Sequence, residues 1–337
     1  IRRPPRSTPK PSSAASDVYK RQDEDSVTMS VEAARRLLGP EDDRSHVDNV
    51  FLASTTMPFA DRLNSGIVRA ALTLEESTQC TDISSTLKCG TTALINAIAS
   101  VQSGKSNYSL VLSSDKRKSR VGSAQELDFG DASAAIGINN KDIIAKVLAT
   151  SSVSVDFVDH FRAPNEEFDY NWEERWIRDE GYLKIIPKLI NNLLKENDIN
   201  PSEIKKFILP CIFPRVPQTI SKICGIDPEN VVDNLALNVG DSGSAHPLLM
   251  LTHVLENAEP NEKILVCSFG GGGDAILLET TKLIRKFKND ESISALLDNG
   301  VEETNYMKYL TFNDLIKWEK GMRGEQDRKT ALTTLYR

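Results

Sequence analysis

The chain lacks the features that mark several large classes of protein. None of its apolar runs reaches the roughly 18 residues of a membrane-spanning helix, and no segment near residue 1 has the charged-then-apolar order of a signal peptide. Positive charge is not in excess, because the formal net charge is -7. We interpret the short basic run Lys116 to Lys118 as a solvated loop. Neither nucleic acid nor a membrane is therefore expected as a partner.

Cysteine is scarce, and its pattern is unpaired. The five cysteines are odd in number and widely spaced, and no two form a Cys-x-x-Cys pair: Cys80, Cys89, Cys211, Cys224 and Cys267. Such a pattern disfavours a disulfide framework and a zinc cluster, and it fits a reducing compartment. We therefore expect a cytoplasmic protein without a structural metal.

The first residues differ in composition from everything that follows. Residues 1–22 are rich in Pro, Ser and Arg and show almost no apolar periodicity, whereas Asp23 to Ser26 opens an amphipathic helix at Val27. The segment resembles translated adapter sequence, and the alternative is a genuine disordered tail. In either case we expect it to carry no chemistry.

From Asp23 onward, short apolar runs alternate with helical patterns. Helices are predicted over 91–104, 181–197 and 246–257, where apolar residues recur at helical spacing. Strands are predicted over Val47 to Thr55, Tyr108 to Asp115, a run ending at Ile138, Lys206 to Pro210, and Lys263 to Phe269. The alternation predicts an α/β architecture with largely buried sheets, and 337 residues suffice for a large core or two fused domains.

The two parts of the chain end in a similar way. Phe129 to Ile136 and Phe269 to Ile276 each give a strand end, a Gly/Asp turn and small residues that enter another strand. This weak internal repeat suggests a duplicated fold. We expect one half over 23–140 and a second half over 141–280.

Five segments in order resemble a known family. They are DEDSVTM from Asp23, LKCGTTALINA from Leu87, FGDASAAI from Phe129, NVGDSGSAHPLLML from Asn238 and SFGGGGDAILL from Ser268. Together they resemble HMG-CoA synthases and ketoacyl-ACP synthase III of the thiolase superfamily. The resemblance implies a thiolase-like five-layered αβαβα fold of two similar halves, usually dimeric. It also implies an acyl-CoA thioester as substrate, with no other cofactor, and a cysteine that becomes acylated.

The sequence departs from the family at the residues that carry its chemistry. Aligned on the shared Lys88, the nucleophilic cysteine of the family falls on Leu87. The place of the catalytic histidine holds Cys211, and the usual asparagine matches Asp241. The glutamate of HMG-CoA synthase matches Thr55. The resemblance therefore implies a condensing acyltransferase with a degenerate catalytic centre.

Cys89 is the alternative nucleophile, provided that the register shifts locally. On a helix, two residues rotate a side chain by about 200°, so Cys89 would otherwise point away from the pocket that Leu87 faces, as a buried small hydrophobe. Cys211 and Asp241 are the other catalytic candidates. A carboxylate can act as a base if its pKa is raised, but Asp241 could equally be a helix N-cap.

Further residues are candidates for binding the substrate. The backbone N–H groups of Gly270, Gly271 and Gly272 could hold a developing oxyanion, although a tight turn between strands is the alternative. His160 matches the place where the family lines its acyl-CoA entrance, with a surface histidine as the alternative, and His246 lies near Asp241 in sequence.

The last part of the chain is charged and carries a weaker apolar pattern. Residues 281–337 resemble a linker toward a zinc-ribbon and OB-fold domain in fused relatives, and the alternative is a free amphipathic helix and tail. Three functions stay open. They are a condensing enzyme, a non-catalytic thiolase-fold subunit that partners an active thiolase, and a cysteine-independent thiolase-like aldol lyase. A homodimer or a heteromer with a thiolase is expected.

Overall fold

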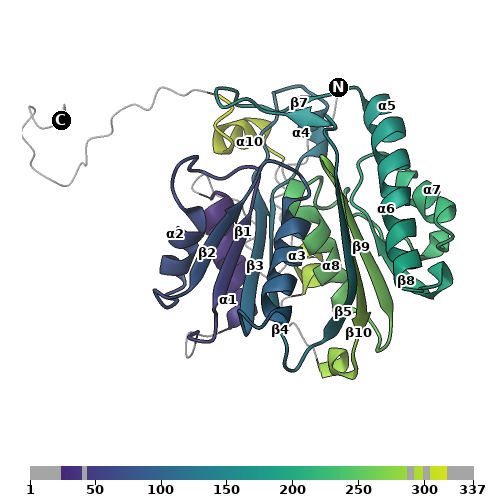
Figure 1. Cartoon of the computed structure of the whole chain (residues 1–337). Coiled ribbons are helices and arrows are strands. Elements are labelled where there is room, and N and C mark those ends of the chain that lie inside the picture. Colours follow the sequence, from purple (N-terminus) through teal and green to yellow (C-terminus); the bar gives the residue numbers. More distant parts are fainter. Residues whose placement is uncertain (1–23, 40–43, 287–291, 299–303, 317–337) are drawn as a thin grey trace, which may run out of the picture.

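The structure is a computed structural model that describes residues 24–39, 44–286, 292–298 and 304–316 (Figure 1). The prediction for residues 1–22 lies outside this part of the chain. The strands are β1 Asn49–Ala53, β2 Gln79–Ile83, β3 Tyr108–Asp115, β4 Ala132–Asn139, β5 Ala145–Ser154, β6 His160–Phe161, β7 Tyr170–Asn171, β8 Ile204–Ile208, β9 Lys263–Phe269 and β10 Gly272–Thr280. The α-helices are α1 Ser26–Leu38, α2 Asn64–Ala71, α3 Cys89–Gln102, α4 Gln125–Asp128, α5 Glu174–Trp176, α6 Leu183–Glu196, α7 Val216–Ile223, α8 His246–Glu256, α9 Ile293–Asp298 and α10 Tyr306–Phe312.

The two four-stranded sheets share the arrangement of three of their strands. The first has the order β2-β1-β3-β4 and the second the order β5-β10-β9-β8. In each sheet a parallel pair, β1 with β3 or β8 with β9, is followed by an antiparallel partner, β4 or β10. The strands β4 and β10 begin within the two similar segments of the sequence. The predicted α/β fold of two similar halves is therefore confirmed.

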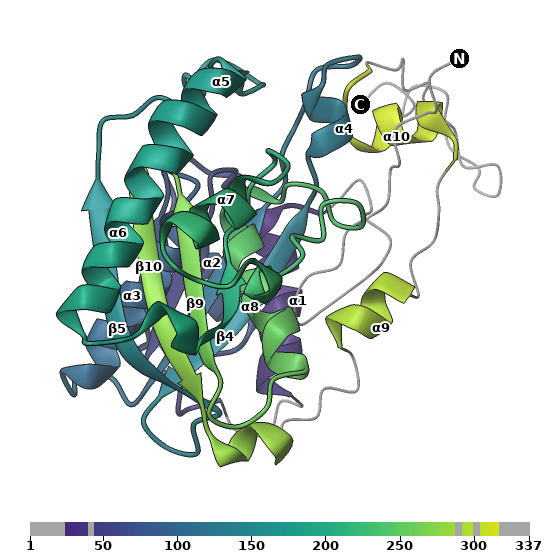
Figure 2. The same ribbon diagram turned by 90° about the vertical axis from the view of Figure 1, so that its right-hand side faces the viewer.

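The helices and sheets form five layers, and three large apolar cores hold these layers together. Leu110 and Leu112 of β3 face α1 and α2, whereas Val111 between them faces a central layer of α3 and α8. Strand β9 alternates in the same way, because Val266 faces the central layer and Leu265 faces α6 and α7. Successive side chains of a strand point to opposite faces, so strands covered on both faces need continuous apolar runs. Figure 1 shows α3 and α8 between the two sheets, and Figure 2 shows α6 and α7 on the near side of β9 and β10.

Polar groups join the two halves at the centre of the molecule. The Lys88 ammonium lies 3.0 Å from the carboxylate of Asp274, and Thr91 and Thr92 donate hydrogen bonds to the same carboxylate. Asp274 has no exposed surface. A buried carboxylate is stable only when it is paired and hydrogen-bonded, so these bonds fix α3 of the first half against β10 of the second.

The predicted elements agree closely with the structure in the apolar runs. Strands β3 and β9 have the predicted bounds, and α3 begins two residues before its predicted start. Strands β2 and β5 were not predicted. They lie at sheet edges, and their side chains are mostly half-buried or exposed, so neither shows the apolar pattern that marks a covered strand.

Candidate functional site

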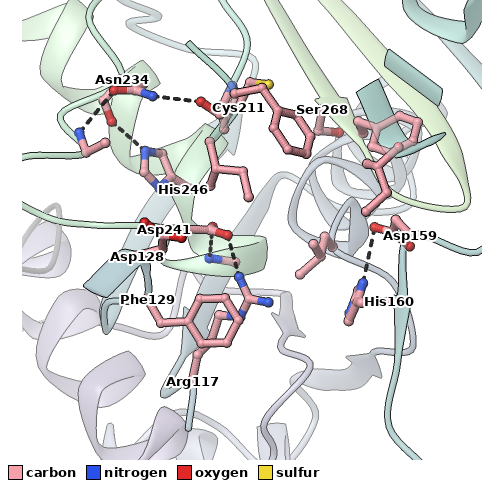
Figure 3. Close-up of a pocket in the computed structure, with 18 of the residues that line it drawn as sticks. Arg117, Asp128, Phe129, Asp159, His160, Cys211, Asn234, Asp241, His246 and Ser268 are labelled. Atoms are coloured by element: carbon pink, nitrogen blue, oxygen red, sulfur yellow. Dashed lines mark hydrogen bonds and ion pairs between the residues drawn. The ribbon is translucent and has the colours of Figure 1, made fainter. Parts of the chain in front are cut away.

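A cavity of about 230 Å³ lies where the two halves meet (Figure 3). The first half contributes Leu87, just before α3, and residues of the segment between β3 and β4. The second half contributes residues from the segment before α6, the loop after β8, the segment before α8 and the end of β9. Several strands thus end at one cavity, as is common for ligand sites of layered α/β folds.

Four apolar or aromatic lining residues, here called the apolar wall, are Leu87, Tyr182, Phe213 and Phe269. The ring centroids of Tyr182 and Phe269 are 4.2 Å apart, and those of Tyr182 and Phe213 are 6.1 Å apart. Phe269 is 5% exposed and Phe213 is 9% exposed. This wall excludes water and suits an apolar group of a ligand.

Three charged lining residues, here called the charged wall, are Arg117, Asp128 and Asp241, which Figure 3 shows close together. The Arg117 guanidinium donates from Nη1 to Asp241 at 2.5 Å and from Nη2 to Asp169 at 3.2 Å. It also lies 3.6 Å above the ring of Phe129. The interpretation of Lys116 to Lys118 as a solvated loop is therefore wrong for Arg117, whose side chain is only 2% exposed.

The two carboxylates of the charged wall have opposite electrostatic environments. Burial would raise the pKa of Asp241, but the Arg117 cation and a hydrogen bond from the Gly243 N–H lower it overall. Burial and the negative charges of Asp241 and Glu174 raise the pKa of Asp128. Asp241 is therefore held ionised in its ion pair, without the raised pKa that a carboxylate base would need.

The ion pairs of the charged wall continue into the hairpin of β6 and β7. Arg162 donates to Asp169 at 2.5 Å and also to the carbonyl oxygen of Thr55. Lys118 lies 3.0 Å from Glu167 in the same hairpin. Arg162, Asp169, Arg117 and Asp241 thus form one chain of alternating charges that joins three segments of the fold.

Cys89 is not among the residues that line the cavity. It is fully buried and packs in the central core with Ala93 and Val111. Burial raises the pKa of the Cys89 thiol well above its usual value, and the Asp115 carboxylate raises it further. Leu87 lies in a turn before α3 and lines the cavity. Leu87 precedes α3, and Cys89 is the first residue of α3, so the two side chains point apart at the start of the helix. The prediction instead placed both residues on one continuous helix.

Cys211 lines the cavity and lies beside Tyr182. Burial raises the pKa of the Cys211 thiol to about 12, although a hydrogen bond with Tyr182 lowers it. Burial also raises the pKa of the Tyr182 hydroxyl well above its usual value, and that hydroxyl donates to the carbonyl oxygen of Pro210 at 3.2 Å. Both groups are therefore protonated at neutral pH, and neither is a thiolate or phenolate nucleophile.

Both candidate histidines line the cavity. His246 accepts a hydrogen bond at Nδ1 from the Ser242 N–H, and its Nε2 lies 2.7 Å from the carbonyl oxygen of Asn234. This pair of contacts requires the proton on Nε2, so the ring is the neutral tautomer. His160 lies on β6, with Nδ1 3.1 Å from the Asp159 carboxylate.

The glycine turn between β9 and β10 packs behind Leu87. A side chain on Gly270 would come within 3.0 Å of the backbone nitrogens of Leu87 and Lys88, which explains why glycine is needed there. Thr86 donates to the Gly270 carbonyl oxygen at 2.6 Å, and the Gly270 N–H donates to Gly272. Gly270, Gly271 and Gly272 are not among the lining residues, and the Gly270 N–H is already used within the turn.

Thr55 lies behind the cavity, next to a buried carboxylate. Its N–H donates to Asp115 at 2.7 Å, and the second oxygen of Asp115 accepts from the N–H and hydroxyl of Ser244. Asp115 thereby ties the end of β1 to the loop that carries Asp241. Thr55 has no acidic group, so it cannot supply the carboxylate that the resemblance implies at its position.

All five cysteines are free thiols. Within the described ranges, no three His, Cys, Asp or Glu side chains are arranged to hold a metal ion. No helix in the same part of the chain is long and apolar enough to cross a membrane.

Known proteins resemble the chain in sequence. The family model of the 3-oxoacyl-[acyl-carrier-protein] synthase III C-terminal region matches residues 194–278. The hydroxymethylglutaryl-CoA synthase of Methanopyrus kandleri is 26% identical over 89% of this chain and 85% of the relative. That of Caldivirga maquilingensis is 28% identical over 89% of this chain and 86% of the relative.

Solved structures resemble the chain in fold. An HMG-CoA synthase complexed with CoA aligns with a TM-score of 0.71 at 17% identity, over 89% of this chain and 80% of that chain. The 3-oxoacyl-[acyl-carrier-protein] synthase III of Aquifex aeolicus aligns with a TM-score of 0.66 at 20% identity, over 76% of this chain and 85% of that chain. At such identities, the likeness establishes the thiolase-like fold.

Proposed function

Because this chain is a thiolase-superfamily protein similar to HMG-CoA synthase and ketoacyl-ACP synthase III, we propose that its cavity binds an acyl-CoA thioester without forming a cysteinyl acyl-enzyme. It would act as a non-catalytic subunit beside an active thiolase. The similar HMG-CoA synthase was solved with CoA, which supports this class of ligand.

The observation that carries the proposal is the position of Leu87. Leu87 lines the cavity, next to the glycine turn, whereas the sulfur of Cys89 is buried in the core. An acyl-enzyme requires a thiolate that the thioester carbonyl can reach. A leucine side chain has no nucleophilic atom, and it contributes apolar surface in the same place.

The remaining polar groups of the cavity do not replace a nucleophile and its base. Cys211 is a protonated thiol, and Asp241 is held ionised by Arg117. His246 already uses both ring nitrogens in contacts with Ser242 and Asn234. The geometry thus supports binding and orientation of a thioester more than acyl transfer.

Calorimetry and intact-mass measurement test the proposal together. Titration with butyryl-CoA should give saturable binding, and incubation with acetyl-CoA or acetoacetyl-CoA should add no acyl group to the chain. An adduct that disappears in Cys89→Ala or Cys211→Ala would restore the condensing-enzyme interpretation. Failure of butyryl-CoA to bind would remove the acyl-CoA interpretation itself.

The role as a subunit has its own test. The chain, expressed together with an active thiolase, should co-purify with it, and all acyl adducts should form on the thiolase. Acyl transfer by the isolated chain at the rate of an ordinary condensing enzyme would contradict the role.

A cysteine-independent aldol lyase is the second candidate. The observation that favours it is a donor and an acceptor among the lining residues. The Tyr182 hydroxyl, which contacts Cys211, can protonate the thioester enolate, and the Asp128 carboxylate, whose pKa is raised, can accept the proton of the β-hydroxyl. Carbon–carbon cleavage of a β-hydroxyacyl-CoA by the wild type, lost in Tyr182→Phe, would support this candidate. Absence of cleavage would exclude it.

A further inference from the structure

We propose that the cavity selects acyl groups without a negative charge, and that Asp128 is the residue that sets this selectivity. The inference rests on the proposed function, because it names the class of acyl group that the same cavity takes. It excludes acyl thioesters that end in a carboxylate.

The charges around the cavity are unbalanced. Among the described lining residues, Arg117 is the only lysine or arginine, whereas Asp128, Asp159 and Asp241 are all carboxylates. Like charges that share a poorly hydrated cleft repel one another more strongly than in bulk water. An additional carboxylate on an acyl group would therefore enter a cavity that is already negative.

The positive charge of the single cation is already compensated by two carboxylates of the protein. Nη1 donates to Asp241 and Nη2 donates to Asp169, and the ring of Phe129 lies 3.6 Å from the guanidinium carbon. A ligand carboxylate would therefore compete with Asp241 and Asp169 for the charge of Arg117, and it would be repelled by both of them.

The two histidines do not change this balance. Both ring nitrogens of His246 are already in contact with the protein, at the Ser242 N–H and the Asn234 carbonyl oxygen. The Nδ1 of His160 lies 3.1 Å from the Asp159 carboxylate. Any positive charge that His160 gains is therefore already offset by Asp159.

Asp128 differs from the other carboxylates of the cavity. It is the last residue of α4 and is exposed, and no ion pair joins its side chain to a cation within the described residues. It lies next to Asp241, whose N–H donates to the Asp128 carbonyl oxygen at 2.6 Å, and Figure 3 shows the two together. Its charge is thus the least compensated of the three, and a ligand meets it directly.

A pair of ligands with matched acyl chains tests the inference. Butyryl-CoA and succinyl-CoA have acyl chains of equal length and differ in the terminal carboxylate. Calorimetry on the wild type should give a dissociation constant about threefold higher for succinyl-CoA than for butyryl-CoA, because the repulsion comes largely from an exposed and screened carboxylate. Asp128→Asn should reduce this ratio, and Asp128→Lys should bring it to about one or below. Glu76→Gln, an exposed acidic site that does not line the cavity, should leave the ratio unchanged.

The outcomes separate this inference from the proposed function. Equal affinity of the wild type for the two ligands would overturn the selectivity while leaving acyl-CoA binding intact. An unchanged ratio in both Asp128 variants would overturn the role of Asp128. Failure of butyryl-CoA to bind the wild type would overturn the proposed function and this inference with it.

Discussion

The two walls of the cavity are built in different ways. The apolar wall of Leu87, Tyr182, Phe213 and Phe269 is held by ring contacts and by burial. The charged wall is held by the ion pairs of Arg117, whose guanidinium binds Asp241 and Asp169. The apolar wall can pack against an apolar group of a ligand. In the charged wall, Arg117 and Asp241 are already paired within the protein.

This difference explains how a binding cavity can persist without the chemistry of its family. Dispersion and apolar burial do not depend on a particular reactive atom, so an apolar wall that contains Leu87 still suits a ligand in the proposed function. Acid–base chemistry does depend on a free titratable group. Here Asp241 is neutralised by Arg117, a residue whose side chain is 2% exposed.

The largest expected effect comes from breaking the charged wall at its centre. Arg117→Ala leaves Asp241 and Asp169 without their shared cation, and we expect a loss of about 3–5 kcal/mol of unfolding free energy. Urea denaturation followed by circular dichroism measures it. The matched control is Arg117→Met combined with Asp241→Asn, which should recover most of the loss because Asp169 keeps its ion pair with Arg162. A loss below about 1 kcal/mol in Arg117→Ala would contradict the importance of the ion pairs.

A substitution in the apolar wall should lower the unfolding free energy somewhat less than Arg117→Ala does. Phe269 is 5% exposed and contacts the rings of Tyr182 and Phe157, so Phe269→Ala should lower the unfolding free energy by about 3 kcal/mol. Phe59, which is 42% exposed, provides the control, because Phe59→Ala should change stability little. Comparable losses in the two variants would mean that the wall is not packed as described.

The pH dependence of stability should arise at the charged wall and not at the apolar wall. The pKa of Asp241 is lower in the folded state than in the unfolded state. Its contribution to stability is therefore present above the unfolded pKa and is lost as the pH falls through the folded pKa, that is, below about pH 4. Denaturation between pH 7 and pH 2 should show a shallower acid loss in Asp241→Asn than in the wild type. Parallel curves would contradict the ion pair.

The smallest effect is expected at the rim of the charged wall. The pKa of Asp128 is raised, so its ionised form is disfavoured in the folded state, and this penalty disappears as the pH falls below the folded pKa. Asp128→Asn should therefore stabilise the protein slightly at pH 7, by about 0.5 kcal/mol or less, because the side chain is exposed and screened. The thermal midpoint at low ionic strength measures the change. A lower midpoint in Asp128→Asn would contradict this expectation, because it would mean that the Asp128 carboxylate has a favourable partner in the folded state.

The apolar wall and the layers were more predictable from the sequence than the charged wall. Strands β3 and β9 follow from apolar runs, and the position of Leu87 follows from the motif around Lys88. Periodic burial leaves a local signal in the sequence. The edge strands β2 and β5 leave little signal, because their exposed faces tolerate polar residues.

Arg117 could not be recognised in the same way. Its run of Lys116 to Lys118 looks like a solvated loop, and its partners Asp169 and Asp241 lie far away in the sequence. The one usable signal is its position directly after β3, where strand ends commonly form a site. Long-range pairing of charges depends on the fold, so the composition of a short run cannot reveal it.

Alkylation of a cysteine placed at position 87 tests directly whether position 87, rather than Cys89, faces the cavity. In a Cys80→Ser background, which removes the half-buried thiol, Leu87→Cys should gain one rapid modification by iodoacetamide at pH 8, and butyryl-CoA should slow it. The Cys80→Ser protein alone should stay unmodified, because burial raises the pKa of both Cys89 and Cys211. The contradicting result would be rapid modification of Cys89 in the Cys80→Ser protein that butyryl-CoA slows, with no additional modification in Leu87→Cys. It would mean that Cys89, and not position 87, faces the cavity.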